Sequence, residues 1–322
     1  MHSIAQEQTQ SQLKQETHEY PPPSIWLRAL RSPLWICLLI GIAVRLFLIL
    51  HADPTLAGDE AMTGIQAENI LHGLRPIYYY NQPYMGSLEA YILALFFAIA
   101  GPSVHVLRVA TMSVSLIMIV LTWFLSSALA DQAKLQGKAK KTFVLIATLI
   151  AALPPVYDAV LEMRSLGGYV EAMVIMLWTL LAALRLTQRW SARASFVELA
   201  LRWLGIGFLI GLGLWVDPLT VYAFAAAALW IGGSIIFGLL RPLQRPHARR
   251  TLLVETLFAL VAIPGSFIGF IPGIIYGLQN QWANITYMLR SGGGQQSSIH
   301  QKLQLFSIYS TCTAPRVIGG SL

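Results

Sequence analysis

The sequence predicts an all-α polytopic membrane protein with about seven transmembrane helices and one interfacial or re-entrant segment. Of its 322 residues, 56% are hydrophobic and only 11% are charged, and the mean hydropathy is +0.60. Soluble domains do not carry so large an excess of apolar residues. The apolar residues also fall into separate runs, and a helix needs about 20 of them to cross a bilayer. The surroundings of the chain must therefore include lipid.

The formal net charge of +7 lies mainly in short loops between the apolar runs. Lys and Arg in such loops orient a membrane protein, so the charge does not indicate nucleic acid as a partner. The two cysteines, Cys37 and Cys312, are far apart in the sequence. They predict neither a disulfide framework nor a cysteine metal site.

The first element follows a polar, proline-broken stretch, residues 1–32, which we expect to be a disordered cytoplasmic tail. The apolar run 33–50 comes next, and no small-residue cleavage site follows it, so it is interpreted as a retained signal-anchor helix. Arg45 lies inside this run. A long basic side chain near a helix end can reach lipid head groups, and we expect this of Arg45 rather than a functional role.

Seven more apolar runs follow, at 87–100, 104–130, 143–156, 170–186, 203–216, 219–240 and 252–278. The first of them contains Glu89 and is too short to span, so it is predicted to be interfacial or re-entrant. The other six, with the signal anchor, make the seven expected transmembrane helices.

The positive charges agree with this choice. If residues 87–100 do not span, the N-terminus and the loops near Lys138, Arg189 and Arg245 all face the cytoplasm, which holds most of the 22 Lys and Arg residues. Residues 51–101 then form the first outer loop, and residues 279–322 are an extracytoplasmic tail or truncated loop. Most acidic residues fall at the outer face: Asp53, Asp59, Glu60, Glu68, Glu89, Asp158, Glu162, Glu171 and Asp217.

The adjacent acids Asp59 and Glu60 open the most polar stretch of the chain. One interpretation is that Asp59 is the N-cap of a helix over 60–72, with Gly73 as its left-handed stop. The other is that a carboxylate beside the membrane, with a pKa raised by desolvation, acts as a general base. The residues alone leave both interpretations open.

A second acidic patch lies in 157–171, where Arg164 is expected to pair with Glu162 or Asp158. Gly167 and Gly168 let the backbone approach a ligand, or only break the chain before a helix. Tyr80 and Tyr84 belong to a tyrosine cluster that is typical of a membrane interface, although the same rings can stack on a sugar.

Three segments carry a family resemblance: GDEAMTGIQAENILHG from Gly58, QPYMGSLEAYILALFFAIAGPS from Gln82, and LPP followed by RSLGGYVEA from Arg164. They resemble the N-terminal half of bacterial C-type membrane glycosyltransferases (GT-C). The pattern is similar to the protein-mannosyltransferase-like group, glycosyltransferase family 39, and to the aminoarabinose and galacturonic acid transferases. The resemblance covers roughly residues 33–290 and implies a GT-C-like fold for the transmembrane domain, 33–278.

The resemblance implies an inverting enzyme of the cell membrane that moves a sugar from a polyprenyl-phosphate donor to an acceptor hydroxyl on the outer face. The acceptor would be a lipid, a glycan or a protein. Asp59 matches the acid of the family's first outer loop and is the expected base, with Glu60 as its neighbour. Glu171 is the first choice for the second outer acid, and Asp158 is the second choice.

One position departs from the family. Some relatives have a lysine that holds the lipid phosphate where this chain has Gln82, so the phosphate contact is expected from Arg75, Arg164 or a later residue. Tyr80, Gln82, Tyr84 and Glu89 complete the expected binding residues. Asp59 and Glu60 would hold Mg²⁺ or Mn²⁺ if a metal takes part.

Two other functions stay open, a multi-pass transporter and a non-catalytic or truncated scaffold. A transporter would be expected to have inverted repeats, and the sequence contains no convincing repeat. Relatives of the GT-C type usually have more helices than the seven predicted here. We therefore expect the 322-residue chain to be inactive alone, or to be the front part of a longer product.

Overall fold

The computed structural model of the chain describes residues 33–51, 55–188, 195–240 and 256–292, together with residues 304 and 307. The predicted tail of 1–32, the basic residues at 241–250 and nearly all of 293–322 lie outside these ranges. The described elements are α3 (Leu34–His51), α4 (Gly58–Leu71), β1 (Tyr78–Tyr79), β2 (Gln82–Gly86), α5 (Leu88–Ala100), α6 (Val104–Gln132), α7 (Gly137–Ala152), α8 (Val156–Leu161), α9 (Tyr169–Gln188), α10 (Phe196–Val216), η1 (Pro218–Thr220), α11 (Val221–Leu240), η2 (Ala259–Val261), α13 (Ala262–Gly269), α14 (Ile271–Gln279) and α15 (Ala283–Gly292).

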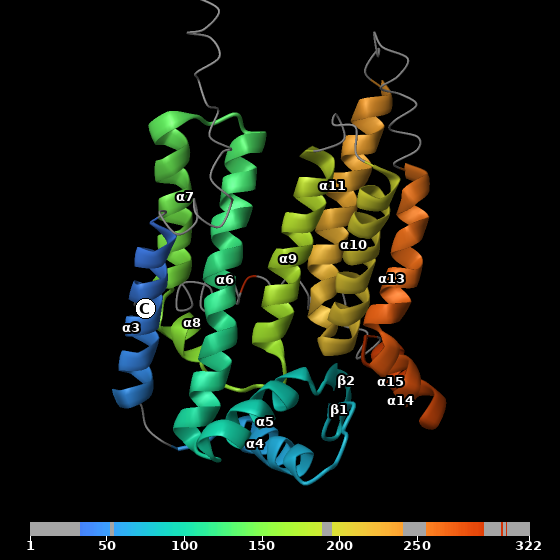
Figure 1. Cartoon of the computed structure of the whole chain (residues 1–322). Coiled ribbons are helices and arrows are strands. Elements are labelled where there is room, and N and C mark those ends of the chain that lie inside the picture. The colour runs from blue at the N-terminus through green and yellow to red at the C-terminus, as the bar shows by residue number, and fades with distance from the viewer. Residues whose placement is uncertain are drawn as a thin grey trace, which may run out of the picture.

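The long helices stand side by side, and α4, α5, β1 and β2 lie together across one end of them (Figure 1). We call this the hairpin end. The opposite end, where α6 turns into α7 and where α10 begins, is called the loop end (Figure 1). In the core, α6 packs against α3 and α7 through Ile119 and against α9 through Val114 and Leu121. The stretch 58–100 thus closes one end of a helical bundle.

Among the described residues, five helices are long and apolar enough to cross a membrane: α3, α6, α9, α10 and the stretch Pro218–Phe237 that includes most of α11. A sixth span results if Thr256–Gly269 and Ile271–Gln279, which meet at a bend of 56°, are counted together. Helix α7 has 16 residues, a length of about 24 Å, and would be the seventh. The chain is thus a helical polytopic membrane protein.

Helix α5 has only 13 residues and packs beside α4 at the hairpin end (Figure 1). If residues 87–100 do not cross the membrane, as predicted, they must form a short helix at one end of the bundle. The expectation of a purely α-helical chain missed the short antiparallel pair β1–β2, in which Tyr78 faces Gly86. The Trp215 Nε1–H at the end of α10 donates to the Ile77 carbonyl at 3.0 Å and fixes the hairpin to the bundle.

Helices α10 and α13 meet at a glycine contact. A Cβ atom added at Gly207, Gly211, Gly265 or Gly269 would lie 1.9 to 2.3 Å from a backbone oxygen of the facing helix. Small residues four apart allow helix backbones to approach this closely within a membrane. Helix α13 is therefore held against α10, and the bend after it directs α14 and α15 to the hairpin end (Figure 1).

The prediction for Arg45 is wrong. Its side chain is completely buried, and it pairs with Glu162 of the segment after α8. It also donates to the carbonyls of Ala152 at 3.1 Å and Ala151 at 3.3 Å, where α7 ends. These free carbonyls at the helix end, together with a carboxylate, replace the lipid phosphates that the sequence suggested.

Candidate functional site

Most of the predicted site residues lie at the hairpin end, on α4, β2, α5 and the segment that leads into α9 (Figure 1). They do not form a single cluster. The structure separates them into an exposed acid, a buried acid paired with arginines, a buried pair of carboxyl groups, and a tyrosine surface.

The exposed acid is Asp59, at the second position of α4. The helix begins at Gly58 with Ala57 as its N-cap, so the interpretation of Asp59 as N-cap is wrong. The Glu60 carboxylate takes the capping role instead and accepts the Ala57 N–H at 3.0 Å. The predicted stop is confirmed, since Gly73 follows the helix with φ of +98°. The Asp59 side chain therefore faces outward at a helix start, where a carboxylate is favoured.

Glu60 turns inward and is completely buried. Its Oε2 atom accepts from Arg164 Nη2 at 3.0 Å, and its Oε1 atom lies 3.6 Å from Nε of Arg108. The predicted pairing of Arg164 with Glu162 or Asp158 is thus wrong, because Glu162 is taken by Arg45. Two guanidinium groups face one carboxylate, and we call this the arginine-matched centre.

Glu89 and Glu171 form the buried carboxyl pair, and each residue is 3% exposed. Glu89 Oε2 accepts the N–H groups of Gly167 and Gly168, both at 2.8 Å, and Thr111 donates to Oε1 at 3.3 Å. Neither oxygen of Glu171 has a hydrogen-bond partner among the described residues, and its charge would repel that of Glu89. Burial raises the pKa of Glu89, while the surrounding donors oppose the rise.

Tyr84 belongs to a surface of tyrosines and acids. Its ring stacks on Tyr287 of α15, with centroids 5.1 Å apart and planes 4° from parallel. Burial raises the pKa of the Tyr84 phenol, and neighbouring groups add to the rise: Tyr169, Tyr287, Asp217 and Asp59. This surface therefore reaches Asp59, the exposed acid at the start of α4.

Burial likewise raises the pKa of Tyr79 to about 12, so this phenol is a donor, and it donates to the Asp59 carbonyl at 3.0 Å.

Tyr80 and Gln82 line a separate pocket of about 350 Å³ between the hairpin and Tyr276 of α14. The other two predicted residues lie elsewhere. Arg75 is exposed and donates to the carbonyls of Ile70 and Leu74 near the end of α4. Asp158 belongs to α8 and lies near Glu162, in contrast to Glu171, whose charged neighbour is Glu89. Of the two choices for the second acid of the site, Glu171 is the one that lies beside Glu89 of α5.

The geometry does not favour a metal held by Asp59 and Glu60 together. The first carboxylate faces outward, and the second is occupied by two arginines and a backbone N–H. Within the described part of the chain, no group of three or more His, Cys, Asp or Glu side chains could hold a metal ion.

Sequence reasoning missed three residues of this end. Arg108 interrupts the first turns of an apolar run, and the same signal singled out Arg45. Asp217 was placed among the outer acids but was not chosen for the site, although its carboxylate accepts the Leu219 N–H at 2.7 Å between two spans. Tyr287 gave no signal, because its role depends only on where α15 packs.

Comparisons with protein-family models, with curated proteins and with solved structures find no match to this chain.

Proposed function

We propose that this chain is an inverting glycosyltransferase of the cell membrane that acts at its hairpin end. It moves a sugar from a polyprenyl-phosphate donor to the hydroxyl of a lipid, glycan or protein acceptor. The observation that carries this proposal is the exposed carboxylate of Asp59 next in the sequence to Glu60, which is buried and pairs with Arg108 and with the partly exposed Arg164. A base and guanidinium groups are the two kinds of residue that this reaction requires.

Asp59 acts as the base. It takes the proton of the acceptor hydroxyl while the acceptor oxygen bonds to the anomeric carbon of the sugar. The bond from that carbon to the phosphate oxygen breaks on the opposite side, and the lipid phosphate leaves with the electron pair. Attack from the opposite side inverts the anomeric centre.

Arg164 is the residue that stabilises the departing phosphate. Its side chain is 33% exposed, so it can contact a ligand while one Nη donates to Glu60. Contacts between guanidinium groups and phosphate are strong and directional. The stacked rings of Tyr84 and Tyr287 offer the flat surface against which a sugar ring packs.

The orientation follows from charge. Helix α7 begins at the loop end, and Lys138, Lys140 and Lys141 lie in its first turns. Basic loops face the cytoplasm, so the hairpin end faces outward. Cysteine labelling should find position 138 cytoplasmic and position 163 extracytoplasmic.

The test incubates the purified chain in liposomes with radiolabelled polyprenyl-phosphate hexoses and pentoses, and measures free polyprenyl phosphate. Asp59→Asn should lower the rate by about 100-fold or more, because a positioned base contributes on that scale. Glu68→Gln is the matched control, an exposed acid on the same helix, and should keep the wild-type rate. Release by Asp59→Asn at the wild-type rate, on a donor that wild type turns over, would exclude Asp59 as base. No release from any donor would contradict transfer by this chain alone.

A further inference from the structure

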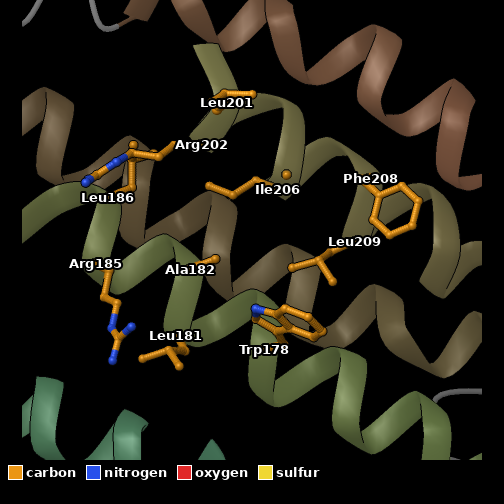
Figure 2. Close-up of a pocket in the computed structure, with 11 residues that line it drawn as sticks. Trp178, Leu181, Ala182, Arg185, Leu186, Leu201, Arg202, Ile206, Phe208 and Leu209 are labelled. Atoms are coloured by element: carbon orange, nitrogen blue, oxygen red, sulfur yellow. The ribbon is translucent and has the colours of Figure 1, made fainter. Parts of the chain in front are cut away.

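Helices α9 and α10 enclose a groove of about 410 Å³ on the side of the bundle, and Figure 2 shows its walls. Leu181 and Ala182 of α9 line one wall, and Ile206 and Leu209 of α10 line the other. The groove takes no part in the site at the hairpin end, because its lining residues, within 178–186 and 201–209, include none of that site.

The rim of the groove is apolar and open. Leu201, Trp178 and Phe208 are 61%, 53% and 40% exposed, so in a membrane they contact lipid. A Cβ atom built on Gly205, which also lines the groove, would meet nothing within 4 Å. The groove therefore has unfilled space next to the acyl chains of the bilayer.

Two arginines mark one end of this groove. Arg185 comes from the last turn of α9 and Arg202 from the second turn of α10, and Figure 2 shows both residues at the same end of the groove. Arg202 pairs with Glu198 of its own helix, and the Arg185 guanidinium lies 5.4 Å from the centre of the Phe124 ring. With Glu198 counted, this end of the groove carries one net positive charge.

We propose that the groove holds an acyl chain of an anionic phospholipid, with the lipid phosphate between Arg185 and Arg202. Charge complementarity identifies the occupant, because an apolar channel that ends in two guanidinium groups matches a phospholipid, whose acyl chains are joined through glycerol to a phosphate. Basic pockets between transmembrane helices on the cytoplasmic side are known to bind anionic head groups. In the orientation given above, the lipid comes from the inner leaflet.

Native mass spectrometry of the purified full-length chain tests this binding. The chain is titrated with palmitoyl-oleoyl phosphatidylglycerol and, separately, with phosphatidylcholine of the same acyl chains. Wild type should bind one phosphatidylglycerol more tightly than any phosphatidylcholine. The double variant Arg185→Gln, Arg202→Gln should weaken that binding by on the order of 10-fold or more. Gly205→Leu, which fills the groove, should also weaken it.

Matched variants separate this site from general effects. Lys138→Gln removes an exposed positive charge at the loop end, and Gly232→Leu adds the same side chain at another open glycine, on α11. Both should bind phosphatidylglycerol as wild type does. The double variant Arg185→Lys, Arg202→Lys keeps the charge and should retain most of the binding, which guards against loss through misfolding.

Three results would overturn the proposal. The first is equal binding by wild type, the double Gln variant and Gly205→Leu, and the second is equal affinity for the two lipids. The third is a wild-type chain that binds no phosphatidylglycerol at any concentration of the titration. In that case a cysteine at position 205 that stays protected from a membrane-soluble maleimide in lipid-free detergent would indicate a protein segment in the groove.

Discussion

The hairpin end contains two buried acidic centres, and they offset the free-energy cost of burying a carboxylate in different ways. Glu60 has no exposed surface and is matched by Arg108 and Arg164. Glu89 and Glu171 are each 3% exposed, yet no ion pair reaches either of them among the described residues, and their compensation is limited to N–H and hydroxyl donors on Glu89. Burying a carboxylate requires either a cation or a bound proton. Cations thus hold Glu60 in place, whereas only neutral donors hold Glu89.

The largest expected effect comes from breaking the arginine-matched centre. Glu60→Gln should lower the free energy of unfolding by about 3 kcal/mol, because it leaves two guanidinium groups without their carboxylate. Thermal unfolding in detergent, followed by circular dichroism, measures the change. Glu68→Gln on the same helix is the control and should stay within about 0.5 kcal/mol of wild type. A Glu60→Gln chain as stable as wild type would show that the arginines do not depend on this acid.

The next effect tests how the carboxyl pair is held. Gly168→Ala should cost about 1 to 3 kcal/mol, because φ is +103° at this position and residues with a Cβ are strained there. A Cβ atom itself has room, 3.5 Å from Val216 Cγ1, so the cost lies in the backbone that donates to Glu89. Gly58→Ala is the control, since nothing lies within 4 Å of its Cβ. Equal stabilities of the two variants would mean that the loop conformation does not matter.

A smaller effect should appear in the pH dependence of stability. The pKa of Glu89 is raised in the folded chain, so the folded state binds more protons than the unfolded state once the pH exceeds the ordinary glutamate value. Stability from this group is complete below that value and is lost as the pH rises through the folded pKa. Glu89→Gln should remove this decline, because the amide accepts the same N–H groups without titrating. Unfolding midpoints at a series of pH values measure it, and an unchanged slope in Glu89→Gln would assign the decline to another group.

The smallest effect on stability is expected at Asp59. This acid is exposed, and its backbone carbonyl, not its carboxylate, accepts the hydrogen bonds of Tyr79 and Thr63. Asp59→Asn should therefore change the free energy of unfolding by less than about 0.5 kcal/mol. The same unfolding measurement checks this, with wild type and Glu68→Gln beside it. A large loss of stability would place Asp59 with Glu60 as a structural acid.

Much of the bundle was predictable, because long apolar runs leave few alternatives in a membrane. The observed bounds of α6, α9 and α11 differ from the predicted runs by only a few residues at each end. The hairpin was not predictable, because a cluster of tyrosines is equally typical of a membrane interface. The 56° bend within the last apolar run had a signal that the prediction did not use, since Pro272 stands in the first turn of α14 and has no backbone N–H to continue the preceding helix.

The partners of the charged residues were the least predictable part of the site. Glu60 pairs with Arg164, 104 positions later, and Arg45 pairs with Glu162, 117 positions later. Sequence reasoning paired Arg164 with the nearest acids, which is reasonable for a helix surface but not for chain segments that meet through folding. That Asp59 faces outward and Glu60 inward likewise follows from the start of α4 at Gly58, two residues before the predicted start.

The glycine contact between α10 and α13 has a consequence for the distant site. Any side chain added at Gly207 or Gly269 must move the axis of α13 away from α10, since backbone oxygens occupy the space. Helix α13 continues through the bend into α14 and α15, so the shift is transmitted to Tyr287, which stacks on Tyr84. The width of the tyrosine surface is thus set by the separation of two helix axes within the membrane. Substitutions within the bundle can thus change the geometry of a surface on which they make no contact.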